Sequence, residues 1–246
     1  MSIVTIPQHN PDVVELPTAF DEPHESIHSG QIDYAGFDNN PALKRASDSL
    51  GFGRVEASAI NQLRVNPNPE HRAALHDRTV REACDKFDRS LAEKFDGAKA
   101  ALLVELSSVE AALTTKAGLK SNPIYVDAIT SSFFNMNAEK RMATLTELIE
   151  QCDGASLATL IAAPLFITGL TAESRDSIKE RLFRRVDPKG LALRNQLNVA
   201  LARLENASLA SLPMRAKLRA GTGDGAWRER SKAAAARAAA DNLARR

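Results

Sequence analysis

The chain has 246 residues, a formal net charge of +1 and only 5% aromatic residues, while Ala, Leu, Glu, Lys and Arg dominate long stretches. This composition favours an all-α protein with a sizeable core, and the two cysteines, Cys84 and Cys152, argue against a disulfide framework. Residues 1–40 contain no Lys or Arg, which argues against a signal peptide, and the longest uncharged apolar stretch, 155–170, is too short to cross a membrane. We therefore expect a soluble, cytoplasmic protein.

Charge is distributed unevenly along the chain. Residues 1–40 hold seven acidic residues, whereas residues 213–246 hold nine basic residues against three acidic ones. With His neutral, these two segments carry net charges of −7 and +6. Because opposite charges attract, each segment is expected to meet an oppositely charged surface.

Residues 1–69 are predicted to form an acidic, extended arm, because they contain seven of the eleven prolines. Such a segment buries too little apolar surface to order itself alone. Two short helices are expected within it, over residues 42–50 and 54–63, separated by the GFG tripeptide. Its spaced hydrophobic residues, among them Phe20, Tyr34 and Phe37, are predicted to dock on a surface elsewhere.

Residues 70–118 are predicted to form one long amphipathic helix, since this stretch has no proline. Gly118 is expected to end the helix in the left-handed conformation that is usual for a glycine at this position. Its apolar residues repeat every eleven positions, at Val80, Cys84, Phe87, Leu91, Phe95, Ala98, Leu102, Leu106, Val109 and Leu113. Eleven residues make three helical turns, so the apolar seam stays on one face of a nearly straight helix. Such a helix would be about 70 Å long, which predicts an elongated molecule. We expect Leu91, Phe95, Leu102, Leu106 and Leu113 to contact partners.

Residues 119–220 are predicted to form a bundle of shorter helices. Asn122, Asn137 and Thr171 are typical caps for helices beginning just after them. The segment 156–167 is apolar nearly all round, so it is expected to be the most buried helix and to bend or end near Pro164. The other expected helices cover residues 124–134, 138–151, 172–186 and 191–209.

Residues 221–246 are predicted to be a Gly-rich hinge followed by a basic, Ala-rich helix, with Pro213 marking the start of the flexible break. Its Trp227 could anchor a partner or stack on a base. The basic residues near this end are Arg215, Lys217, Arg219, Arg228, Arg230, Lys232, Arg237, Arg245 and Arg246. They could bind nucleic-acid phosphates or the acidic arm of another subunit, or they could simply solvate the helix.

The pentapeptide HESIH, from His24 to His28, matches the H-E-x-x-H pattern of zinc metalloproteases. In that chemistry His24 and His28 would bind zinc and Glu25 would act beside the metal-bound water. The resemblance is confined to these five residues, because the extended metalloprotease pattern and a third ligand are missing. A zinc-dependent hydrolase is therefore kept as a remote alternative, and no catalytic residue, cofactor or metal is expected.

Together these patterns predict an elongated all-α protein with a long hendecad helix, a bundle of shorter helices, an extended N-terminal arm and a separate basic C-terminal helix. We expect a non-catalytic structural protein that works within a homo-oligomer or another multi-subunit assembly, of which a virus particle would be one example. Nucleic-acid association through the basic tail is the alternative.

Overall fold

The computed structural model describes residues 13–20, 39–66, 73–220 and Lys232, and within these ranges the chain is almost entirely helical and contains no strand. The chain divides into two compact units, which we call unit 1 (residues 1–101 and 200–246) and unit 2 (residues 102–199). The helices run in the order η1 Thr18–Phe20, α2 Pro41–Val65, α3 Ala73–Lys116, η4 Pro123–Tyr125, α4 Val126–Phe134, α5 Ala138–Glu150, α6 Gly154–Ala162, α7 Leu165–Thr168, α8 Ala172–Val186 and α9 Pro188–Arg219. The domains predicted from the sequence are successive segments of the chain. The two compact units are not, because α3 and α9 each contribute residues to both. None of the described helices is long and apolar enough to span a bilayer.

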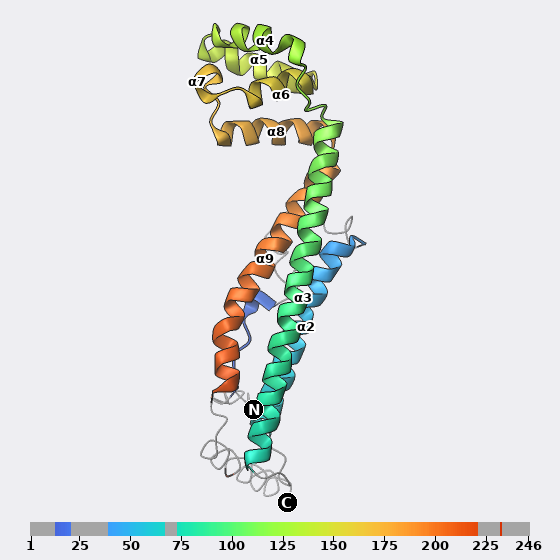
Figure 1. Cartoon of the computed structure of the whole chain (residues 1–246), viewed down its shortest axis with the longest axis vertical. Helices are drawn as coiled ribbons and strands as arrows, with labels where there is room; N and C mark the ends of the chain where they lie inside the picture. Colours follow the sequence, from blue (N-terminus) through green and yellow to red (C-terminus); the bar gives the residue numbers. More distant parts are fainter. Residues whose placement is uncertain (1–12, 21–38, 67–72, 221–231, 233–246) are drawn as a thin grey trace, which may run out of the picture. The chain divides into compact units, whose positions relative to one another are not determined.

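Unit 1 packs α2 and the C-terminal part of α9 against the first part of α3 (Figure 1). The apolar positions predicted along this part of α3 are all buried, from Val80 to Ala98. Phe52 of α2 stacks on Phe87 of α3, with ring centroids 6.4 Å apart, and the amine of Lys94 lies 4.8 Å from the Phe52 centroid. Burial also raises the pKa of the Cys84 thiol, so this cysteine behaves as a small core residue.

The helix α2 is continuous, so the prediction of two helices separated by GFG was wrong. Asn40 caps its start, because the Asn40 side chain accepts hydrogen bonds from the backbone N–H groups of Ala42 and Leu43. Glycine costs a helix roughly 1 kcal/mol relative to alanine, yet Gly53 is buried against neighbouring side chains. Packing of Phe20 and Leu91 against Gly53 therefore overrides the local preference of this glycine.

An N-terminal segment, residues 13–20, lies against unit 1 and is called the strap below (Figure 1). Both backbone polar groups of Val14 pair with the buried side-chain amide of Asn61, at 3.1 Å and 2.9 Å. The ring of Phe20 is fully buried and lies edge-on to Phe95, with centroids 6.3 Å apart. The predicted docking residue Phe20 thus docks on the chain's own helices.

The helix α9 continues through Pro213 to Arg219, which corrects the predicted break at this proline. Proline removes one backbone hydrogen bond from a helix, but side-chain contacts hold the following turns in place. Met214 and Leu218 are buried, and Arg215 and Arg219 form ion pairs with aspartates of α3. These contacts keep the last turns helical.

Unit 2 is a set of short helices around a core of Leu, Ile and Phe side chains, including Leu145, Leu157, Leu160 and Leu182. The predicted caps are confirmed, since the side chains of Asn122, Asn137 and Thr171 each accept a backbone N–H at a helix start. The predicted left-handed Gly118 is also confirmed, with φ of 61°. The apolar segment 156–167 is divided into α6 and α7 around Pro164.

Arginines from neighbouring helices satisfy the carbonyl groups at the ends of three of these short helices. Arg141 donates to the carbonyls of Phe133 and Phe134 at the end of α4. Arg185 donates to the carbonyl of Glu150 at the end of α5, and Arg175 to that of Ala163 after α6. The last carbonyls of a helix have no partner within the helix, and these arginines supply one. The bonds connect α4 to α5, and they connect α5 and the segment after α6 to α8.

Cys152 closes α5 in the left-handed conformation, with φ of 55°. A side chain costs about 1 kcal/mol in this region, and glycine avoids that cost. We expect Cys152→Gly to raise the free energy of unfolding by about 1 kcal/mol, measured by urea denaturation. Cys152→Ala is the control, because alanine keeps the strained Cβ and should leave stability almost unchanged. An equal gain in both variants would contradict this explanation.

Asp187 joins the start of α9 to the end of α3. Its carboxylate accepts hydrogen bonds from the Lys116 ammonium group and from the backbone N–H of Gly190. These bonds, that to Lys116 first, hold the pKa of Asp187 below its ordinary value of 3.8. A carboxylate whose pKa is lowered by folding stabilises the fold above its unfolded pKa, and this contribution is lost as pH falls through the folded pKa.

We therefore expect Asp187→Asn to be less stable than the unaltered chain at neutral pH. The difference should begin to shrink below about pH 4, the ordinary pKa of the carboxyl group, and should vanish only once pH has fallen through the lower pKa of the folded state. Urea denaturation at a series of pH values measures it. A difference that stays constant down to the lowest pH would show that the side chain acts through its shape and not through its charge.

Candidate interaction sites

The sequence-predicted partner residues of α3 lie inside the fold. Leu91 and Phe95 are buried in unit 1, Leu102 and Leu113 are buried in unit 2, and Leu106 is partly buried. Side chains in these positions stabilise the helices of this chain, so a partner could reach them only after displacing those helices. Tyr34, Phe37 and Trp227 lie outside the described residues, as do His24, Glu25 and His28 of the H-E-x-x-H pattern.

Two of the predicted basic-site residues pair with acidic residues of the same unit. Arg215 Nε donates to Asp88 at 2.5 Å, and Arg219 donates to Asp85 and Asp88 at 2.6 Å each. Lys217 is exposed on α9, and Lys232 is exposed and helical. The other predicted basic residues, Arg228, Arg230, Arg237, Arg245 and Arg246, lie outside the described ranges. The charges of Arg215 and Arg219 are thus neutralised in place, which weakens their attraction for phosphate.

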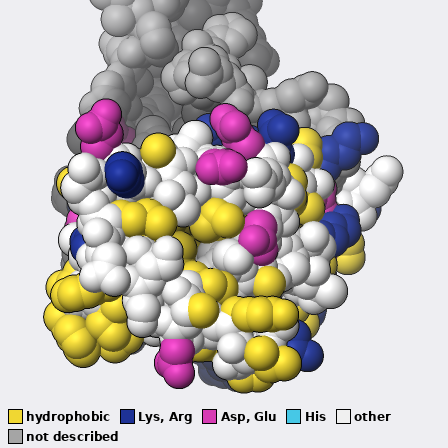
Figure 2. Space-filling view, turned by 90° about the horizontal axis from the view of Figure 1, so that it is seen from above, with side chains coloured by type: hydrophobic (Ala, Val, Ile, Leu, Met, Phe, Trp, Pro, Cys, Tyr) yellow, Lys and Arg dark blue, Asp and Glu magenta, His cyan; other side chains and the backbone are white. Residues whose placement is uncertain are grey.

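Unit 2 exposes large hydrophobic side chains on η4, α4, α5 and α7. We call this set the apolar surface of unit 2, and its members are 54–81% exposed: Ile124, Tyr125, Phe134, Met142, Leu165 and Phe166. Figure 2 shows a face of unit 2 on which hydrophobic side chains are most frequent toward one edge and charged side chains toward the other, with some of both kinds between them. Single exposed hydrophobic residues are ordinary, but several large ones on one unit make that unit a candidate for an interaction surface.

Arg141 fixes the arrangement of part of this surface. It bonds the carbonyl of Phe134 at 2.7 Å, and a Cβ placed on Gly169 would lie 3.5 Å from its Nη1. Gly169 follows α7 directly and takes the left-handed conformation, with its N–H bonded to the carbonyl of Leu165. The end of α4 is therefore bonded to the Arg141 guanidinium group, and the end of α7 lies beside the same group.

Sequence reasoning missed the apolar surface because hydrophobicity alone predicts burial. Phe133 and Phe134 are neighbours in the sequence, yet Phe133 is buried and Phe134 is exposed. Leu165 and Phe166 belong to the segment predicted to be most buried, but the new helix that starts after Pro164 turns them outward. The only available signal was the proline, which interrupts the apolar segment.

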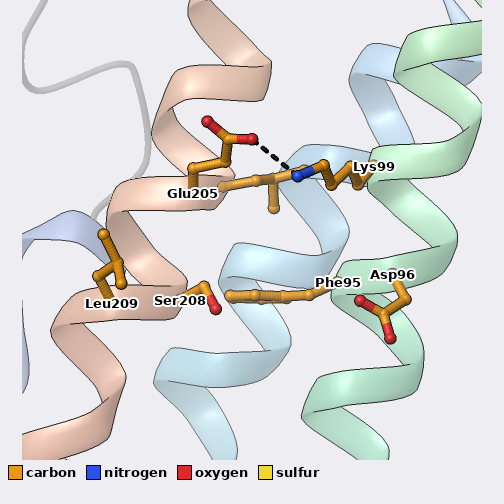
Figure 3. Close-up of a pocket in the computed structure, with 7 residues that line it drawn as sticks. Phe95, Asp96, Lys99, Glu205, Ser208 and Leu209 are labelled. Carbon is orange, nitrogen blue, oxygen red and sulfur yellow. Dashed lines mark hydrogen bonds and ion pairs between the residues drawn. The ribbon is translucent and has the colours of Figure 1, made fainter.

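Unit 1 has a surface cavity of about 360 Å³ between α3 and α9. Figure 3 shows Phe95 of α3 pointing toward Ser208 of α9, and Lys99 of α3 bonded to Glu205 of α9 at 2.8 Å. Leu204, Leu209 and Asp96 complete the lining. An apolar floor with a charged rim can receive one apolar or amphipathic side chain of a partner.

Within the described ranges, no cluster of three or more His, Cys, Asp or Glu residues could hold a metal ion. Comparisons with protein-family models, with curated proteins and with solved structures gave no match for this chain. The interaction surfaces themselves are therefore the basis for a functional proposal.

Proposed function

We propose that this chain is a non-catalytic assembly subunit that associates with copies of itself through the apolar surface of unit 2. The proposal rests on the exposure of six large hydrophobic side chains on η4, α4, α5 and α7 of one unit. Exposed Phe and Tyr side chains are the residue types enriched at the centres of protein interfaces. Helices α4, α5 and α7 present them from a unit whose own core is already filled.

The size of this surface suits association between two copies. At the exposures observed, each of the six side chains offers on the order of 100 Å² to a partner. Two copies meeting through the same surface would then remove roughly 1,200 Å² from water, which is the lower limit for a specific interface. A symmetric pairing also presents the same apolar residues on both sides, as in the commonest homodimers.

Sedimentation velocity over a wide range of protein concentrations tests the proposal. We expect the unaltered chain to form a dimer or larger species, and the double variant Phe134→Ser, Phe166→Ser to associate at least 100-fold more weakly, because a central interface aromatic contributes about 2 kcal/mol or more. The matched control is Val55→Ser, Val104→Ser. These two hydrophobic side chains lie on α2 and α3, outside the apolar surface of unit 2, and are 65% and 72% exposed. A monomer at every concentration, or equal weakening in both double variants, would overturn the proposal.

A further inference from the structure

The strap is held by a site suited to an extended peptide. Asn61 of α2 is buried, and its amide both accepts from the N–H of Val14 and donates to its carbonyl. The Asn61 amide thus pairs with the backbone of Val14 as a neighbouring β-strand would. This pairing does not depend on which side chain stands at position 14. The buried Val14 side chain adds an apolar contact at the same point. If the strap leaves, the Asn61 amide loses both of these bonds, and another strap or water must replace them.

Six residues further along, Phe20 enters a notch in the α2–α3 pair. A Cβ on Gly53 would lie 2.7 Å from Phe20 Cε1 and 3.2 Å from Leu91 Cδ1, so only glycine leaves room for the ring at this distance. Phe95 closes the notch from the side of α3. The Asn61 amide and the Gly53 notch form one groove, which recognises an extended backbone at one end and a phenylalanine at the other.

The connection between the strap and the helix that receives it is long. Twenty residues, 21–40, separate Phe20 from Pro41 at the start of α2. Extended chain covers at most about 3.3–3.6 Å per residue, so this connection can span on the order of 65 Å. Such a length does not restrict a strap to the groove of its own chain, and the groove contacts would be the same for a strap from another copy.

We propose that the groove of unit 1 accepts residues 13–20 of a second copy, so that copies are linked by exchanged N-terminal straps. This inference rests on the proposed function, in which it supplies a second contact of the same assembly. Because an exchanged strap makes the contacts of a closed one, the closed form prevails at low concentration and exchange increases with concentration. Exchange of an identical element is a low-cost route to linked subunits.

Two complementary variants test strap exchange, both made in the Phe134→Ser, Phe166→Ser background so that the apolar surface of unit 2 does not contribute. The first, Phe20→Ser, has an open groove and a strap without its anchor. The second, Gly53→Leu, has an intact strap and a groove whose notch is filled. Neither variant alone has both an intact strap and an intact groove, whereas the mixture combines the intact groove of Phe20→Ser with the intact strap of Gly53→Leu.

We expect the mixture to form a heterodimer, detected by sedimentation velocity of one fluorescently labelled variant, with affinity at least tenfold higher than either variant shows alone. Circular dichroism verifies that both variants stay helical, and Asn61→Leu serves as a second groove variant if Gly53→Leu fails to fold. Mixtures of Phe20→Ser with each groove variant that contain only monomers would overturn the inference. Because the apolar surface is already disabled, this result is independent of the test of the proposed function.

Discussion

Replacing Gly154 with alanine should destabilise unit 2 by about 3 kcal/mol or more. Gly154 is the first residue of α6 and is buried against the turn that follows α3. A Cβ at this position would lie 1.8 Å from the carbonyl oxygen of Ala117 and 2.7 Å from the backbone of Gly118. These neighbours are backbone atoms, so they cannot rotate away, and α6 would have to shift.

Gly51→Ala is the matched control for Gly154→Ala. Gly51 lies within α2, where a Cβ would meet nothing within 4 Å. Since alanine is a better helix former, this change should stabilise the chain by about 0.5–1 kcal/mol. Urea denaturation followed by circular dichroism measures both variants. If the two substitutions changed stability equally, close packing at Gly154 could not be the cause.

Asp88→Ala should lower the free energy of unfolding by about 2 kcal/mol. Its carboxylate pairs with both Arg215 and Arg219, and the Asp88 and Arg215 side chains are only 16% and 30% exposed. Removing one partner of a fully buried pair costs about 3–5 kcal/mol and of an exposed pair about 0–1 kcal/mol. The intermediate burial of this network, with Arg219 more exposed, places the expected loss between these values.

Glu205→Ala provides the comparison for Asp88→Ala. Glu205 also pairs across α9 and α3, with Lys99, but both side chains are about half exposed. Its removal should therefore cost less than about 1 kcal/mol. Adding salt should also reduce the Glu205 effect proportionally more, because exposed charges are screened more strongly. A larger loss for Glu205→Ala than for Asp88→Ala, in urea denaturation, would contradict the assignment of the stronger network to Asp88.

Local signals predicted much of the helical fold correctly. Asn137 and Thr171 cap helices because their side chains satisfy N–H groups that no upstream carbonyl reaches. Gly118 ends α3 because its left-handed conformation is cheap for glycine alone. These features depend only on a few residues that are neighbours in the sequence, so they can be predicted from the sequence alone.

The errors share a different cause, which is packing between segments distant in the sequence. Gly53 sits within a helix because Phe20 and Leu91 pack against it, and neither contact is visible in the local sequence. Pro213 is tolerated within α9 because flanking residues bind α3, more than a hundred residues away. Phe166 was predicted to be buried because its neighbours are apolar, whereas its exposure depends on where α7 lies against α4.

Hydrogen–deuterium exchange on the unaltered chain, compared at low and high protein concentration, tests the proposed self-association most directly. We expect backbone amides of η4, α4 and α7 to gain protection at high concentration, because association covers the apolar surface that lies on these elements. Amides around Val55 in α2 should exchange at the same rate at both concentrations. Exchange rates in η4, α4 and α7 that do not change with concentration would contradict it.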